Sequence, residues 1–206
     1  MMSNNHKEIE SKFYVRNLDA IENQLQTLGA KCIVPRGFEY NLRYDDQQNN
    51  LQQSRKVLRL RKYDDIRLTF KGPGEKQGNA YSRTEIELIV NDFETAQKFL
   101  EHLGYHVSAI YEKFRAMYRL DTALITLDEL PFGKFVEIED ESPEKIHDLA
   151  CKLKLDPTRA IPASYQGLFE QLKQTKNLSM QNLAFVAFED LSLDAADLGV
   201  QIADEQ

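Results

Sequence analysis

Apolar and charged side chains alternate with a period of two along much of this 206-residue chain. The pattern is clearest in three copies of the tripeptide EIE, at residues 8–10, 85–87 and 137–139, where the acids and the isoleucine point to opposite sides of an extended chain. Such alternation predicts half-buried β-strands. Seven segments show it, namely KEIESKFYV, VLRLRK, RLTFKG, RTEIELIV, EKFRAMYRL, LITLDEL and KFVEIED.

Segments with the helical spacing of apolar residues separate and follow these strands. Asn17, Asp92 and Ser142 are of the residue types that cap a helix N-terminus, and Pro143 suits the first helical position. The expected helices cover about 17–29, 92–104, 142–153 and 163–175, and the expected loops cover 45–54, 72–81 and 131–134. The glycine-rich loop GPGEKQGNAY lacks the GK[ST] ending of a phosphate-binding loop, so we interpret it as a hairpin.

The charged side of these strands is largely sorted by sign, with most acids on the EIE strands and bases on RLR, TFK and KFR. A solvated sheet face is the ordinary interpretation of charged alternation. Helices are available to cover the apolar side, however, so the sheet can curl until its charged faces meet. Partly buried charges are costly unless they are paired or bind a metal. A lumen for a metal–polyphosphate complex accounts for both signs, because bases neutralise phosphates and acids hold Mg²⁺ or Mn²⁺.

Composition narrows the class of protein. The net charge of −7 argues against general nucleic-acid binding. Cys32 and Cys151 lack metal-site spacing and predict reduced thiols in the core, which fits a cytoplasmic protein. The first residues, MMSNNHKE, contain no apolar signal region, and no run approaches membrane-spanning length. We therefore expect a soluble intracellular protein that does not bind membranes. Its expected partner is a small molecule, and the sequence does not decide whether the protein is a monomer or a homodimer.

The motif Glu8-x-Glu10-x-Lys12 resembles the ExExK signature of the CYTH superfamily, also called triphosphate tunnel metalloenzymes. The strands LRLR, LTFKGP, RTEIE, EKFR and LDELPFGKFVEIE follow the family's order, so the resemblance covers about residues 6–140, and PASYQGL at 162–168 looks like its C-terminal helix. It implies an α+β fold, a closed eight-stranded antiparallel β-tunnel with helices packed on its outside, over residues 1–177. Residues 178–206, which are acidic and lack Lys and Arg, are expected to form a docking helix or a loosely held tail.

The same resemblance assigns roles to the charged residues. It implies that the metals are held by Glu8, Glu10, Glu137 and Glu139, with Glu85, Glu87 and Asp128 near a second metal site. It implies that the phosphates are held by Lys12, Arg59, Arg61, Lys71, Arg83, Lys113 and Arg115. The candidate catalytic residues are Lys12, Glu85 and Lys113. For the acids of the middle EIE, Glu85 and Glu87, the alternative to a role at the metal is an ion pair with a base of the tunnel.

Further candidates rest on strand phase or on the family pattern. Arg67 and Arg119 share the inward phase of the tunnel bases. The family carries one more base beyond the last strand, for which Lys173 and Lys176 are the candidates, and Tyr40 and Tyr44 are expected at the tunnel mouth.

Three functions fit such a site. Family members include inorganic and thiamine triphosphatases, class IV adenylate cyclases and RNA triphosphatase-like proteins. The leading expectation is a hydrolase, dependent on Mg²⁺ or Mn²⁺, that cleaves the terminal phosphate of inorganic, thiamine or nucleoside triphosphate, since this chemistry requires mainly positioning and charge neutralisation. The alternatives are a class IV adenylate cyclase, which makes cyclic AMP and pyrophosphate from ATP, and a non-catalytic module that binds polyphosphate or nucleotide.

Overall fold

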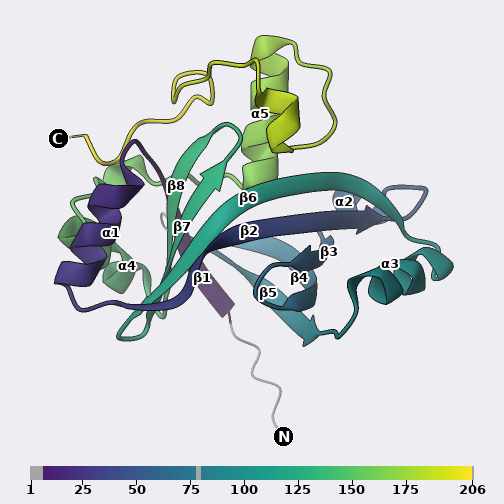
Figure 1. Ribbon diagram of the computed structural model, residues 1–206, viewed down its shortest axis with the longest axis horizontal. Helices are drawn as coiled ribbons and strands as arrows, with labels where there is room; N and C mark the ends of the chain where they lie inside the picture. Colours follow the sequence, from purple (N-terminus) through teal and green to yellow (C-terminus); the bar gives the residue numbers. More distant parts are fainter. Residues whose placement is uncertain (1–6, 78–79, 206) are drawn as a thin grey trace, which may run out of the picture.

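The computed structural model describes residues 7–77 and 80–205, and for residues 7–8, 75–77 and 80–83 it describes the backbone only. Figure 1 shows a strongly curved sheet with helices around it. The strands are β1 (Lys7–Val15), β2 (Lys31–Asp45), β3 (Val57–Lys62), β4 (Ile66–Gln77), β5 (Ala80–Ile89), β6 (His106–Leu120), β7 (Ala123–Leu130) and β8 (Gly133–Asp140). The helices are α1 (Leu18–Thr27), α2 (Asn50–Gln53), α3 (Phe93–His102), α4 (Pro143–Lys152) and α5 (Tyr165–Lys176), with 3₁₀ turns η1 (Pro157–Arg159) and η2 (Phe185–Phe188).

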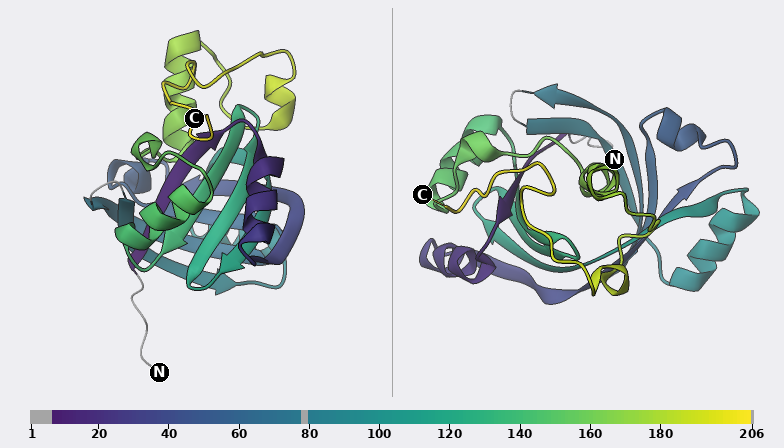
Figure 2. Two further views of the ribbon diagram at one scale, coloured as in Figure 1. Left: turned by 90° about the vertical axis from the view of Figure 1, so that its left-hand side faces the viewer. Right: turned by 90° about the horizontal axis from the view of Figure 1, so that it is seen from above.

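The strands pair in the order β1-β5-β4-β3-β2-β6-β7-β8, and every pairing is antiparallel. β1 also pairs with β8, from Ile9 to Val15, while its first residues pair with β5. In the view from above in Figure 2, the strands curve around a central space. The prediction of eight antiparallel strands with helices outside them is confirmed.

Strand β2 is the element that the alternation did not predict. Pro35 and Gly37 interrupt its pattern, and its pairing with β6 shifts register between Cys32 and Val34 and again between Val34 and Gly37. Such bulges bend a strand and break its period of two. Because of them, the first half of β2 lacks the sequence pattern of a strand although its backbone is paired.

The helices begin where their caps predict. The side chains of Asn17, Asp92 and Ser142 each accept a hydrogen bond from a backbone N–H in the first turn of α1, α3 and α4. The predicted loop 45–54 contains the short helix α2, and most of 72–81 continues strands β4 and β5. These two strands are paired as far as Gln77 and Ala80, so the hairpin interpretation is confirmed.

The apolar side of the sheet faces outward, toward the helices. Helices α1 and α4 pack on β1, β6, β7 and β8, and α3 packs beside β2 and β3 (Figure 2). Tyr40 and Tyr44 belong to this outer side: Tyr44 is buried, and the Tyr40 ring lies 6.1 Å from that of Phe93 on α3. Their expected place at a tunnel mouth is therefore wrong.

The C-terminal segment runs over the sheet beside α5. Within residues 178–205 it forms η2 and no α-helix, and it buries Leu183, Phe188 and Leu198 against α5. The backbone N–H of Ala203 donates to the carbonyl of Tyr14, which ties the segment to β1. It is thus neither a docking helix nor a loosely held tail.

Two further findings concern the cysteines and the lengths of the helices. Cys32 and Cys151 are free thiols and both are exposed, so the prediction that they lie in the core is wrong. Among the helices that the structure describes, none is long and apolar enough to cross a membrane.

Candidate functional site

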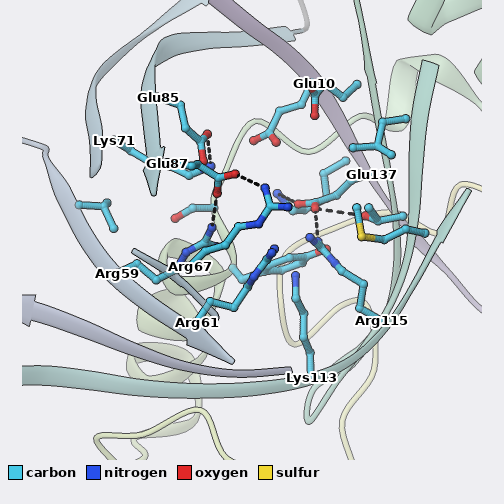
Figure 3. Close-up of a pocket in the computed structure, with 18 of the residues that line it drawn as sticks. Glu10, Arg59, Arg61, Arg67, Lys71, Glu85, Glu87, Lys113, Arg115 and Glu137 are labelled. Carbon is cyan, nitrogen blue, oxygen red and sulfur yellow. Dashed lines mark hydrogen bonds and ion pairs between the residues drawn. The ribbon is translucent and has the colours of Figure 1, made fainter. Parts of the chain in front are cut away.

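The curved sheet encloses a cavity of about 680 Å³, and the charged rows of the strands line it (Figure 3). The predicted bases that reach it are Lys12, Arg59, Arg61, Arg67, Lys71, Lys113 and Arg115, and the predicted acids are Glu10, Glu85, Glu87, Glu137 and Glu139. Arg119 is exposed and is not part of the lining. The side chains of Glu8 and Arg83 lie outside the described residues.

Strand alternation is the reason why these charges point inward. On β3, Arg59 and Arg61 face the cavity, while Leu60 between them is fully buried in the cluster under α3. On β1, Lys12 faces the cavity, while its neighbour Phe13 is buried in the cluster under α1 and α4. Burial of the apolar residues against helices therefore fixes the direction of the bases.

One end of the cavity is organised around Asp128 on β7, which is 0% exposed. Arg115 Nε and Nη2 donate to its two oxygens at 2.6 and 2.5 Å, and Lys113 Nζ lies 3.1 Å from Oδ2. The hydroxyl of Tyr165 donates to the same oxygen at 2.7 Å. Burial lowers the pKa of Arg115, but Asp128, Glu39 and Glu137 together outweigh burial and raise this pKa well above its usual value. Asp128, which was expected near a second metal site, is thus enclosed by protein donors.

Glu137 on β8 joins this network to Lys12. Its oxygens lie 2.9 Å from Lys12 Nζ and 2.6 Å from Arg115 Nη2. Burial alone would raise the pKa of Glu137, but Lys12 and Arg115 hold it well below the usual value. Burial likewise opposes the charged form of Lys12, and Glu137 and Glu10 together raise its pKa above the ordinary value. Both groups therefore stay ionised at neutral pH.

The opposite wall of the cavity comes from β3, β4 and β5. Arg59 donates to the hydroxyl of Tyr111 at 3.0 Å, and Lys71 Nζ lies 2.5 Å from Glu85 Oε2. Arg67 donates to Glu87 at 2.6 Å. The acids of the middle EIE, Glu85 and Glu87, thus form ion pairs with bases of the cavity, which was the alternative to a role at the metal.

Sequence reasoning missed the contribution of β2. Glu39 and Asn41 are both 0% exposed and lie behind the cavity wall, where Asn41 Nδ2 donates to Glu39 Oε1 at 2.9 Å. The signal was present in EYNLRYD, where Glu39, Asn41 and Arg43 alternate with Tyr40 and Leu42. The bulged first half of the strand concealed it.

Helix α5 contributes a tyrosine rather than the expected lysine. Lys173 pairs with Glu170 at 2.8 Å and Lys176 with Asp197 at 2.5 Å, and neither lines the cavity. Tyr165 does line it, with Lys12 Nζ 4.4 Å from the centre of its ring. Burial, then the charges of Asp128 and Glu137, raise the pKa of Tyr165 well above its usual value, so its hydroxyl stays protonated.

Two carboxylates could hold a divalent cation. Glu10 on β1 is the direct cross-strand partner of Glu139 on β8, and both line the cavity. Like charges at such positions repel unless a cation lies between them. Within the described residues no group of three or more His, Cys, Asp or Glu is close enough to form a complete cage. Mg²⁺ commonly binds one or two carboxylates together with substrate phosphates and waters, so this pair fits such a cation.

Comparison with known proteins gives a consistent family. The model of the CYTH domain family matches residues 6–164. The chain is 24% identical over 172 residues to a Methanocaldococcus jannaschii protein named "Putative adenylate cyclase", across 78% of this chain and 97% of that protein.

Solved structures share the fold. A Vibrio parahaemolyticus protein with the same name aligns with a TM-score of 0.73 at 25% identity, over 81% of this chain and 99% of that one. A Hippeastrum protein described as a "Putative adenylyl cyclase" with a dominant triphosphatase activity aligns with a TM-score of 0.60 at 18% identity, over 79% of this chain and 95% of that one. At that identity the likeness concerns the fold.

Proposed function

The chain belongs to the CYTH domain family, whose members act on triphosphates with the help of a divalent metal, and from this premise we propose that it is a triphosphatase. It removes the terminal phosphate of a small-molecule triphosphate, with the eight strands acting as a closed tunnel around the substrate. The observation that carries the proposal is the cavity lining, in which eight Lys and Arg side chains share one space with the Glu10–Glu139 pair.

The bases would hold the phosphate chain in a fixed position. Arg59, Arg61 and Arg115 have planar forks that match two phosphate oxygens at once, while Lys12 and Lys113 are compact charges. These five side chains come from three strands, β1, β3 and β6, and so would reach the substrate from several sides. Phosphoryl transfer depends on positioning and charge neutralisation more than on covalent chemistry, and this arrangement supplies both.

Glu10 and Glu139 would hold Mg²⁺ or Mn²⁺, and Glu8 is expected to join them from the same face of β1. The cation supplies charge neutralisation at the phosphates and activation of the attacking water. Glu137, which pairs with Lys12 and Arg115, would keep these two bases in place beside the cation site. Glu85 and Glu87 are held by Lys71 and Arg67 and would orient these bases toward the substrate.

A second candidate is an adenylate cyclase, which the names of the Methanocaldococcus and Vibrio proteins favour. The same cavity would hold the three phosphates of ATP, and the ribose 3′-hydroxyl would attack the α-phosphorus. This reaction needs a further set of contacts that fixes the ribose and the base. Hydrolysis needs only the phosphate site and water, and we therefore place it first.

Phosphorus NMR separates these functions. The purified protein is incubated separately with inorganic triphosphate, thiamine triphosphate and ATP, first with Mg²⁺ and then with Mn²⁺. Orthophosphate release is the expected result, and the fastest substrate identifies the substrate class. Pyrophosphate together with cyclic AMP would show the cyclase instead. Binding of triphosphate without any turnover would leave a non-catalytic polyphosphate-binding module.

A further inference from the structure

Two fully buried carboxylates stand behind the bases of the cavity, Glu39 on β2 and Asp128 on β7. Neither lines the cavity, but both approach Lys113 and Arg115, which do. Burying a carboxylate is costly unless nearby charges compensate it. The question is what the second buried acid adds to the first.

The two acids contact the bases in different ways. Asp128 accepts short, directed hydrogen bonds from Arg115 and Lys113, which fix where these side chains point. Glu39 lies farther away: its oxygens are 3.5 Å from Lys113 Nζ and 3.9 Å from both Arg61 Nη1 and Arg115 Nε. These separations are ion-pair distances and lie at or beyond the limit for a hydrogen bond. Glu39 therefore acts on the bases through its charge and not by orienting them.

The hydrogen bonding of Glu39 supports this distinction. Asn41 donates to Oε1, whereas Oε2 is buried with no hydrogen-bond donor in the part of the chain that the structure describes. Burial raises the pKa of Glu39, but Lys113, Arg115, Arg59 and Arg61 outweigh this and lower it to about 2. The carboxylate is thus a permanent negative charge at neutral pH.

We infer that Glu39 is a built-in counter-ion that competes with substrate phosphates for Arg61, Lys113 and Arg115. This inference rests on the proposed function and adds a control of affinity to it. A site of unopposed cations would hold triphosphate and the released phosphates tightly. A fixed negative charge behind the cations offsets part of this attraction, so products can leave, while Asp128 keeps the bases in position.

The experiment compares Glu39→Gln with the wild type by calorimetric titration of inorganic tripolyphosphate in metal-free buffer, where turnover does not interfere. Gln keeps the size and the acceptor for Asn41 and removes the charge. We expect the variant to bind roughly tenfold tighter or more, because one negative charge close to several phosphates is lost. In steady-state assays with metal, KM and kcat should both fall, since product leaves more slowly.

Two controls isolate the effect of position and charge. Glu39→Asp keeps the negative charge and should bind tripolyphosphate about as the wild type does. Glu144→Gln makes the same change in net charge at an exposed position on α4 and should leave the affinity unchanged. If either control matched Glu39→Gln, the buried charge would not be the cause and the inference would be wrong.

Unchanged or weaker binding by Glu39→Gln would overturn the inference, because a residue that only positions the bases should weaken binding when it is altered. Absence of binding by the wild type would instead overturn the proposed function, and the inference with it.

If the Glu39→Gln variant does not fold, it is refolded with excess tripolyphosphate. Recovery that depends on the anion supports the counter-ion role, and lack of recovery contradicts it.

Discussion

Arg115 and Asp128 form a bidentate ion pair inside the curved sheet, with Nε 2.6 Å from Oδ1 and Nη2 2.5 Å from Oδ2. The pair joins β6 to β7, and the same guanidinium reaches Glu137 on β8 at 2.6 Å. Because Arg115 also lines the cavity, one side chain connects three strands to the proposed phosphate site. Variants at this pair test both roles.

The change Asp128→Asn should destabilise the fold strongly. It removes the charge closest to Arg115 and Lys113, which leaves only Glu39 and Glu137 to compensate them, and breaking a buried ion pair in this way costs about 3–5 kcal/mol of unfolding free energy. Urea denaturation measures the loss. Tyr165→Phe, which removes only the hydroxyl that donates to Asp128, should cost less, about 1–2 kcal/mol. A loss below that of Tyr165→Phe would show that Asp128 does not hold these bases.

The change Glu10→Gln should remove activity without affecting the fold. Glu10 lines the cavity and attracts Lys12 through its charge. Its replacement should change stability by less than about 1 kcal/mol. As a proposed metal ligand, it should lower turnover by about two orders of magnitude and raise the metal concentration needed for half-maximal rate. Glu144→Gln on the outer surface is the matched control. Turnover near the wild-type value would contradict the metal assignment.

Acid should destabilise the protein partly through Glu39. Its pKa is about 2 in the folded protein and about 4.5 unfolded, so its contribution to stability is present above pH 4.5 and disappears as the pH falls toward 2. The full difference amounts to about 3 kcal/mol. Urea denaturation at several pH values should show a steeper loss of stability for the wild type than for Glu39→Gln. Parallel curves would mean that the charge of Glu39 is not compensated as the structure indicates.

The regular part of the site could be predicted from sequence because alternation alone determines which side of a strand faces inward. This is why Lys12, Arg59, Arg61, Lys71, Lys113 and Arg115 line the cavity as their strand phase predicted, whereas Arg119, near the end of β6, does not. The register between neighbouring strands could not be predicted from this alternation. The pairing of Glu10 with Glu139, and of Arg115 with Asp128, depends on hairpin lengths and bulges that a single sequence does not reveal.

The missed features have physical causes of the same kind. The bulges at Pro35 and Gly37 hid β2, and with it Glu39. On α5, Lys173 and Lys176 were candidates because a further base was expected to reach the phosphates, whereas the structure places the first residue of the helix, Tyr165, at the cavity. Cys32 was expected in the core, but it lies near the bulged start of β2 and is exposed.

The last prediction concerns the C-terminal segment, whose packing was not predicted from the sequence. Its acidic composition suggested a docking helix or a loosely held tail, yet Leu198 is 0% exposed and packs with α5. The change Leu198→Ala should therefore destabilise the protein by about 2–5 kcal/mol, because it leaves a cavity in the cluster that supports α5. Val186→Ala, in the same segment but 73% exposed, should cost less than about 0.5 kcal/mol. Thermal and urea unfolding measure both. Equal effects would mean that the segment does not stabilise the sheet, and lower triphosphate affinity in Leu198→Ala would indicate that this packing also keeps Tyr165 at the site.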